Sequence, residues 1–361
     1  MNTVNELDLR QDVAVLTEDL MNVNSVSGNE QELADQVFNA LQKLDHLQVH
    51  RDGDSIVART NLGRERRVVL AGHLDTVPLP RTEAAKGTVP AQVIDGLLYG
   101  RGATDMKGGV AVQLALAALL TAPKHDISFI FYDHEEVAAS LSGLGRLARN
   151  SPELLAADFA ILLEPTNGTV EGGCNGTSRF VIRTHGTAAH SARAWMGHNA
   201  IHDASEVLRR LADYEPQTID VEGLEFREGM NAVRITGGVA GNVIPDYCEV
   251  EVNYRFAPDK TLEQAEAVVR ELFEGFDIER TDGSNGARPG LDQQIAAELI
   301  SILGQEPKPK YGWTDVARFS ALGIPAVNFG PGDALLAHSD DEHVPQQAIR
   351  DCLDSLHSWL S

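Results

Sequence analysis

The chain has 361 residues, which suggests two domains rather than one small core. Hydrophobic residues make up 43% and charged residues 23%, as in ordinary globular proteins, and the net charge of -23 argues against a nucleic-acid partner. No apolar run reaches the roughly 18 residues that would cross a membrane, and the N-terminus has no secretory pattern, so we expect a cytoplasmic protein with no membrane contact.

The first part of the chain alternates helices with short apolar strands. A helix is expected after the Ser27-Gly28-Asn29-Glu30 segment, where apolar residues recur at helical spacing. Strands are expected at 56–58, 68–71, 127–132 and 159–163, and helices at 108–120 and 141–148. Strands separated by helices predict an α/β layer with a mixed, mostly parallel sheet flanked by helices.

The order of elements changes near residue 177. The expected elements are a strand, a helix, two strands, a helix and a strand, at 179–184, 198–212, 231–239, 247–256, 262–273 and 276–280. This β-α-β-β-α-β order indicates a ferredoxin-like α+β unit. A loop at 281–290 leads out of it, and helix and strand patterns return at 295–303, 316–322 and 326–329. We therefore expect a catalytic metal-binding domain of residues 1–177 plus 289–361, with an inserted domain of residues 178–288.

Acidic and histidine residues follow the apolar strands of the larger domain. Five of them lie just past a strand or in a glycine-bracketed loop, namely His73, Asp105, Glu136, Glu164 and His338. In open α/β sheets, binding sites form beyond the carboxyl ends of the strands. We therefore expect these five side chains to converge on one cleft.

The residue types suit divalent metal ions. The three cysteines are scattered without Cys-x-x-Cys spacing, so any metal is expected on histidine and carboxylate ligands. Imidazole and carboxylate bind zinc or similar ions, and one carboxylate shared by two ions is the usual layout in aminopeptidases. Glu135 is adjacent to Glu136, so one of them is free to transfer a proton from an attacking water to a leaving amine. Each motif alone is common on protein surfaces, but together they favour a metal-dependent amide hydrolase.

At these residues the chain resembles the metallopeptidase and deacylase family that includes aminoacylase, acetylornithine deacetylase and succinyl-diaminopimelate desuccinylase. The resemblance rests on Gly-His73-Leu-Asp75-Thr-Val-Pro, Gly-Arg-Gly-Ala-Thr-Asp105-Met-Lys-Gly-Gly and Glu135-Glu136, and it covers essentially the whole chain. It implies a fold of the zinc-exopeptidase type and two Zn²⁺ ions, for which Co²⁺ can substitute.

The resemblance also implies how the ligands are shared between the two ions. His73 and Glu164 resemble the ligands of one ion, and Glu136 and His338 resemble those of the other. Asp105 is similar to the carboxylate that bridges both ions.

Further roles are implied for residues outside this ligand set. Glu135 resembles the general base, and Asp75 resembles the carboxylate that orients His73. The Asp105–Met106 peptide bond is similar to one that is cis in the family. His190, in the inserted domain, resembles a histidine that reaches a partner chain's active site and stabilises the tetrahedral oxyanion, which implies a homodimer formed through that domain.

The substrate implied by the resemblance is an N-acyl amino acid. Segments 174–179, 189–195 and 311–318 look most similar to desuccinylases of the actinobacterial type, which cleave N-succinyl-LL-2,6-diaminopimelate to succinate and LL-2,6-diaminopimelate in lysine and cell-wall precursor synthesis. An acidic protein needs local cations and donors for such an anionic substrate. The candidates are Arg179, Asn242, Arg255 and Thr314, although each could instead be structural.

Three alternatives stay open at this point. Another N-acyl amino acid deacylase, such as acetylornithine deacetylase, would use the same metal residues, and so would a dipeptidase or carboxypeptidase. The pocket rather than the metal centre distinguishes these enzymes. A non-catalytic metal- or carboxylate-binding protein would keep the ligands but would not need Glu135.

Overall fold

The computed structural model describes residues 6–361, so the first five residues of the N-terminal stretch discussed above lie outside the described residues. The chain separates into two compact units. Unit 1 runs to Gly172 and resumes over Gly290–Lys308 and Arg318–Ser361, and unit 2 comprises Gly173–Pro289 and Pro309–Ala317.

Two segments differ from the expected division, which placed residues 1–177 and 289–361 in the larger domain, because residues 173–177 and 309–317 group with unit 2. Residues 309–317 group with unit 2 because their hydrogen bonds go there. The Asn175 amide donates to the Lys310 carbonyl (3.2 Å), and the Trp313 indole donates to the Asn285 carbonyl (3.1 Å). Tertiary hydrogen bonds of this kind leave no periodic pattern in the sequence.

Unit 1 is built on an eight-stranded mixed sheet with the order β1-β2-β6-β3-β7-β18-β8-β17. The strands are β1 (Gln48–Asp52), β2 (Ser55–Arg59), β3 (Arg67–His73), β6 (Asp126–Tyr132), β7 (Phe159–Leu162), β8 (Glu171–Gly172), β17 (Lys308–Pro309) and β18 (Ala326–Asn328). The central strands β6, β3, β7 and β18 pair in parallel, whereas β1, β2 and β8 pair antiparallel. The expected mixed α/β sheet is confirmed.

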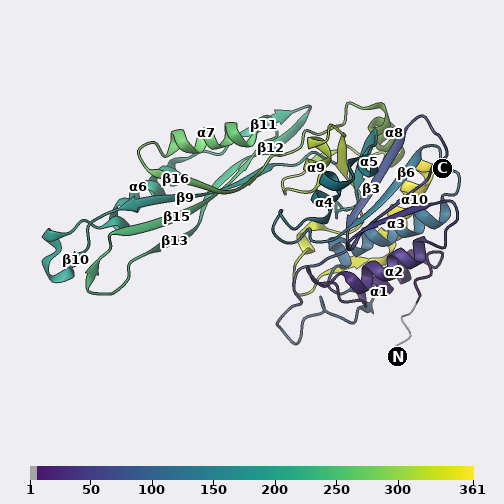
Figure 1. Ribbon diagram of the computed structural model, residues 1–361, viewed down its shortest axis with the longest axis horizontal. Helices are drawn as coiled ribbons and strands as arrows, with labels where there is room; N and C mark the ends of the chain where they lie inside the picture. Colours follow the sequence, from purple (N-terminus) through teal and green to yellow (C-terminus); the bar gives the residue numbers. More distant parts are fainter. Residues whose placement is uncertain (1–5) are drawn as a thin grey trace. The chain divides into compact units, whose positions relative to one another are not determined.

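Helices cover both faces of this sheet, so the central strands are buried along nearly their whole length and are mostly apolar. Val68 and Leu70 of β3 share one core with residues of α1 (Val13–Met21), α2 (Gln31–Leu41), α3 (Gly108–Leu119), α8 (Gln294–Leu303) and α10 (Gln346–Leu360). Val69 and Ala71 are equally buried but lie outside that core, on the other face, where Figure 1 shows α4 (Gly143–Asn150) and α5 (Pro152–Leu155). Helix α3 is buried nearly all round, as a central helix must be.

The remaining elements of unit 1 are short. Strands β4 (Gln92–Ile94), β5 (Leu97–Tyr99) and β19 (His343–Pro345) form a small antiparallel sheet. The others are η1 (Ala103–Lys107), α9 (Val316–Ala321) and η3 (Ala334–Leu336). Among the described residues, no helix has both the length and the apolar character needed to cross a membrane.

Unit 2 has the expected ferredoxin-like order of elements. It runs β9 (Gly176–His185), α6 (Ala200–Asp213), β13 (Gly229–Gly237), β15 (Tyr247–Phe256), α7 (Leu262–Leu272) and β16 (Asp277–Ser284), with the antiparallel strand order β13-β15-β9-β16. Helix α6 buries Ala200, Ala204 and Val207, one apolar stripe at helical spacing. Both helices pack on one face of the sheet, and the other face carries no helix of this unit.

Two small ribbons in unit 2 were not expected from the sequence. Strand β10 (Ala189–His190) pairs with β14 (Val243–Ile244), and β11 (Thr218–Val221) pairs with β12 (Leu224–Arg227). The helical turn η2 (Ser191–Met196) follows β10.

Candidate metal centre

The five predicted ligands come together at one edge of the unit 1 sheet. His73 is the last residue of β3, Glu136 follows the end of β6, and Glu164 follows the end of β7. These three strands are parallel neighbours, so their carboxyl ends meet at the same edge. From β18, the next parallel strand, the chain passes through η3 to His338. The topology of the sheet therefore explains the convergence that the sequence predicted.

Asp105 lies between the two histidines. Its Oδ1 is 3.1 Å from His73 Nε2, and its Oδ2 is 3.3 Å from His338 Nε2. His338 Nε2 is also 2.9 Å from Glu136 Oε1. Each carboxylate oxygen of Asp105 thus faces a different imidazole, which is the arrangement a bridging ligand requires.

The side chains form two overlapping donor sets. In each, three ligand atoms lie within 4.8 Å of one another: His73, Asp105 and Glu164 in the first, and Asp105, Glu136 and His338 in the second. Each set has one imidazole and two carboxylates, and Asp105 belongs to both. Such donors suit zinc and similar ions, so the residues fit a pair of divalent ions with Asp105 between them. A third set of ligand atoms, from His73, Glu135 and Glu136, also lies within 4.8 Å of one another.

Close backbone packing positions two of the ligands. The Asp105–Met106 peptide bond is cis, as expected, and helix α3 begins just beyond it at Gly108. A Cβ atom at Gly109 would lie only 2.2 Å from the Leu163 carbonyl oxygen. Only glycine therefore lets the start of α3 approach the strand end that carries Glu164.

The charges of the site perturb the titration of both histidines. Burial opposes protonation of His73, but the carboxylates of Asp105, Asp75 and Glu164 outweigh it and raise the pKa of the imidazole well above its usual value. Hydrogen bonds to Asp105 and Glu136 raise the pKa of His338 to about 10. Without metal, the surrounding carboxylates therefore favour the protonated form of both rings, and an incoming ion must compete with that proton.

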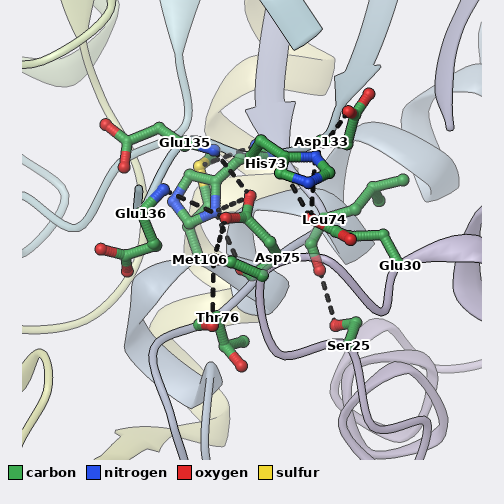
Figure 2. A network of polar contacts seen from close by, with 12 residues as sticks. Ser25, Glu30, His73, Leu74, Asp75, Thr76, Met106, Asp133, Glu135 and Glu136 are labelled. Carbon is green, nitrogen blue, oxygen red and sulfur yellow. Dashed lines mark hydrogen bonds and ion pairs between the residues drawn. The ribbon is translucent and has the colours of Figure 1, made fainter. Parts of the chain in front are cut away.

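The carboxylate of Asp75 holds the backbone of the Glu135–Glu136 pair (Figure 2). Asp75 Oδ1 accepts from the Glu135 amide and Oδ2 from the Glu136 amide, each at 3.0 Å, and Oδ2 also accepts from the Ser27 hydroxyl at 2.6 Å. His73 Nδ1 lies 3.0 Å from the Asp75 main-chain carbonyl and 3.6 Å from its carboxylate. Burial raises the pKa of Asp75, but its partners outweigh burial and lower it to about 2, so the acceptor is ionised.

A second polar network supports the same turn, and the sequence did not point to it. Asp133 Oδ1 accepts from Ser55 Oγ at 2.6 Å and from Arg146 Nη2 at 2.7 Å. The His134 ring lies 2.7 Å from Asp133 Oδ2, and the His134 amide donates to the buried Glu30 carboxylate at 3.2 Å. Glu30 lies in a segment whose sequence indicates only the start of a helix, so it carried no signal of this contact.

Four predicted residues lie in unit 2, two on its sheet, one in β10 and one in the turn before β14. Arg179 of β9 and Arg255 of β15 are exposed and point to the sheet face away from α6 and α7, because Arg179 pairs with Asn253, two positions from Arg255. His190 is exposed in β10, and the Ser191 amide next to it donates to the Asn242 carbonyl at 2.9 Å. The structure therefore places the two arginines together and His190 beside Asn242.

Thr314, the remaining predicted substrate contact, is buried in unit 2, 7% exposed. Its carbonyl oxygen lies 3.8 Å from the Cys174 thiol. The approach of these five unit 2 residues to the ligands of unit 1 stays a prediction.

Comparison with known proteins gives consistent matches. Peptidase family M20/M25/M40 matches the chain over residues 69–361. The DapE protein of Mycobacterium tuberculosis is 49% identical over 357 residues, covering 98% of this chain and 99% of that protein. The succinyl-diaminopimelate desuccinylase of Corynebacterium glutamicum is 45% identical over 366 residues, covering 98% of each.

Solved structures show the same fold at low sequence identity. A tripeptidase from Staphylococcus aureus superposes with a TM-score of 0.78 at 22% identity, covering 99% of this chain and 98% of the other. A dinuclear metal-binding peptidase from Bacillus subtilis superposes with a TM-score of 0.72 at 18% identity, covering 97% of both chains.

Proposed function

Because this chain belongs to peptidase family M20/M25/M40, we propose that it is a metal-dependent amide hydrolase that cleaves N-succinyl-LL-2,6-diaminopimelate to succinate and LL-2,6-diaminopimelate. The observation that carries the hydrolytic part is the shared Asp105, whose two oxygens face His73 and His338. The substrate is supported by the 45% identity to a relative named for this reaction.

The metal ions of the proposal are two Zn²⁺, with Co²⁺ as a substitute. His73 and Glu164 would hold one ion, Glu136 and His338 the other, and Asp105 both. When bound, the ions supply an activated water and polarise the amide carbonyl.

Glu135 is the proposed general base. Its backbone is fixed by Asp75, and its carboxylate has an oxygen within 4.8 Å of ligand atoms of His73 and Glu136. From there it takes the proton of the attacking water and delivers it to the leaving amine, which completes cleavage of the amide bond.

Unit 2 supplies the remaining substrate contacts in this proposal. In the proposed homodimer, His190 of one chain donates a hydrogen bond to the oxyanion in the active site of the other chain, where negative charge develops in the transition state. Arg179 and Arg255, one strand apart on the uncovered sheet face, offer guanidinium groups to substrate carboxylates. Asn242, beside His190, and Thr314 add polar groups.

A homodimer through unit 2 is part of the proposal. Strand β13 is an edge strand, and its Val233 and Ile235 are 57% and 50% exposed. Helix α6 also exposes Ile201 and Leu208. An apolar sheet edge of this kind needs a cover in solution, and a second copy would provide it. The molecular mass in solution tests this part.

A cytoplasmic location completes the proposal. All three cysteines are buried free thiols, which is typical of proteins from reducing compartments.

A turnover panel tests the function. The enzyme is stripped of metal with a chelator, reloaded with zinc, and assayed on N-succinyl-diaminopimelate, N-acetylornithine, other acylated amino acids and dipeptides. We expect chelation to abolish activity, zinc to restore it, and the succinylated substrate to give the highest kcat/KM. A higher kcat/KM for a dipeptide or for N-acetylornithine would show that the proposed substrate is wrong. Activity that is unchanged after removal of the metal would reject the metal-dependent mechanism.

A further inference from the structure

Glu342 is a fully buried acid that the proposed reaction does not use. Its side chain accepts four hydrogen bonds. Oε1 accepts from the amides of Thr104 (3.0 Å) and Asp105 (3.1 Å), and Oε2 accepts from the Gly102 amide (3.1 Å) and from Arg101 Nη1 (2.7 Å). One carboxylate therefore accepts hydrogen bonds from four of the residues in the loop that carries Asp105.

Main-chain groups around Glu342 reinforce this attachment. The Gly100 amide donates to the Glu342 carbonyl (3.1 Å), and the Thr104 hydroxyl donates to the His343 carbonyl (2.8 Å). Arg101 Nη1 also donates to the Ser339 carbonyl (3.2 Å), next to His338. Residues 100–105 and 338–343 are thus tied into one piece that carries two of the predicted ligands.

We propose that Glu342 is a positioning residue that fixes Asp105 relative to His338 and so sets the affinity of the site for its second ion. The inference rests on the proposed two-metal function. Hydrogen bonds from backbone amides to a carboxylate are strong and directional, and a carboxylate with no exposure to water holds them without competition. The held amides of Thr104 and Asp105 fix the backbone from which the Asp105 carboxylate extends toward the two histidines.

The two ions depend on Glu342 to different degrees. Two of the three ligands in the second set, Asp105 and His338, lie in residues 100–105 and 338–343, and the third is Glu136. Only one ligand of the first set, Asp105, lies in these segments, since His73 and Glu164 lie elsewhere. Loss of Glu342 is therefore expected to weaken the ion held by His338 more than the ion held by His73.

The test substitutes Glu342→Gln, which keeps the side-chain shape but turns one acceptor oxygen into a donor that faces other donors. Metal-free protein is titrated with Zn²⁺ calorimetrically, and the His338→Ala variant identifies the binding step that belongs to the His338 ion. The absorption spectrum of the Co²⁺-loaded protein and the Tm of the metal-free protein are recorded alongside.

Asp126→Asn is the matched control. Asp126 is a buried carboxylate that also accepts from two backbone amides, those of Leu62 (2.8 Å) and Arg64 (2.9 Å), and from the Thr60 hydroxyl (2.8 Å). It begins β6, at the opposite end from Glu136, roughly 20 Å away along the strand. Loss of the Asp126 carboxylate disturbs a comparable hydrogen-bond network and leaves residues 100–105 and 338–343 unchanged.

We expect Glu342→Gln to weaken the His338 step by about 10- to 100-fold, to change the Co²⁺ spectrum, and to weaken the other step less. Asp126→Asn should lower the Tm and leave both steps unchanged. If Glu342→Gln lowers the Tm but leaves both steps at wild-type affinity, the carboxylate is only structural and the inference is wrong. A wild-type protein that binds fewer than two ions would instead overturn the proposed function.

Should Glu342→Gln fail to fold, Thr104→Val replaces it. That substitution removes only the hydroxyl bond to His343 and keeps the carboxylate and its four donors. A selective, smaller weakening of the His338 step supports the inference, and unchanged binding at both steps contradicts it.

Discussion

Substitution of Asp75 by asparagine is expected to disable the Glu135–Glu136 turn while leaving most of the metal site in place. The carboxylate accepts from the amides of both glutamates at 3.0 Å and from Ser27 Oγ at 2.6 Å. An asparagine amide keeps only one acceptor oxygen, so at least one of the two backbone bonds is replaced by two donors that face each other.

The expected size of the effect follows from these contacts. A hydrogen bond to a charged group contributes about 1.5–3 kcal/mol, so we expect a similar loss of stability. For a unit of this size, that loss corresponds to a fall in Tm of about 3–12 °C. A displacement of Glu135 by about 1 Å costs roughly 100-fold in rate, so kcat should fall by that order.

The assay compares kcat, KM, bound zinc and Tm for Asp75→Asn, Ser27→Ala and the wild type. Ser27→Ala is the control because it removes the hydroxyl bond to the same carboxylate and leaves both backbone bonds intact. We expect the loss of kcat in Asp75→Asn alone, with the ion held by His73 and Glu164 retained and any loss of zinc confined to the ion held by Glu136 and His338. If Asp75→Asn instead loses the zinc held by His73 and keeps its rate per bound zinc, the carboxylate acts on His73 rather than on the two glutamates, and the reasoning fails.

Three further predictions concern the same centre. Glu135→Gln should lower kcat by about 10²–10⁴-fold at unchanged zinc content; full activity would reject its role as base. His190→Ala should lower kcat more than it raises KM, because oxyanion stabilisation acts in the transition state, and steady-state kinetics with an unchanged kcat would contradict this. Because the pKa of His338 is raised to about 10 in the metal-free protein, its ring is protonated at pH 8, whereas a free histidine is mostly neutral. Zinc binding at pH 8 should therefore release protons, seen as a binding heat that changes with the ionisation enthalpy of the buffer, and a heat independent of the buffer would refute it.

The sequence was informative about the metal residues because they depend on local patterns and on one topological rule. His73 and Glu164 each follow an apolar strand, and parallel neighbours must end at the same edge of the sheet. The periodicity of α3 and of the strands in unit 2 was equally local. For these elements, side-chain spacing alone fixes which face is buried.

Other features depend on contacts that spacing does not encode. The hydrogen bond from the Glu135 amide to the Asp75 carboxylate joins positions 60 residues apart, and no pattern in either segment predicts it. Residues 281–284 were expected in a linker, but β16 continues through them because its pairing with β9 resumes after a bulge between Arg280 and Asp282.

Helix α10 was missed although the sequence held its signal. Ile349, Cys352, Leu356 and Trp359 recur at helical spacing and are all buried. This spacing is sufficient to predict helix α10 from the sequence alone.

The discontinuity of unit 1 has a consequence for the order in which the protein forms during synthesis. The chain emerges from the ribosome N-terminus first, so β18 and α10, which complete the sheet and core of unit 1, appear only after residues 173–289 have been made. Those residues form nearly all of unit 2 and have a core of their own. The inserted unit can thus fold while β7 still lacks its neighbour β18 and α3 still lacks its cover α10, so apolar surface of the surrounding unit stays open to aggregation until late in translation.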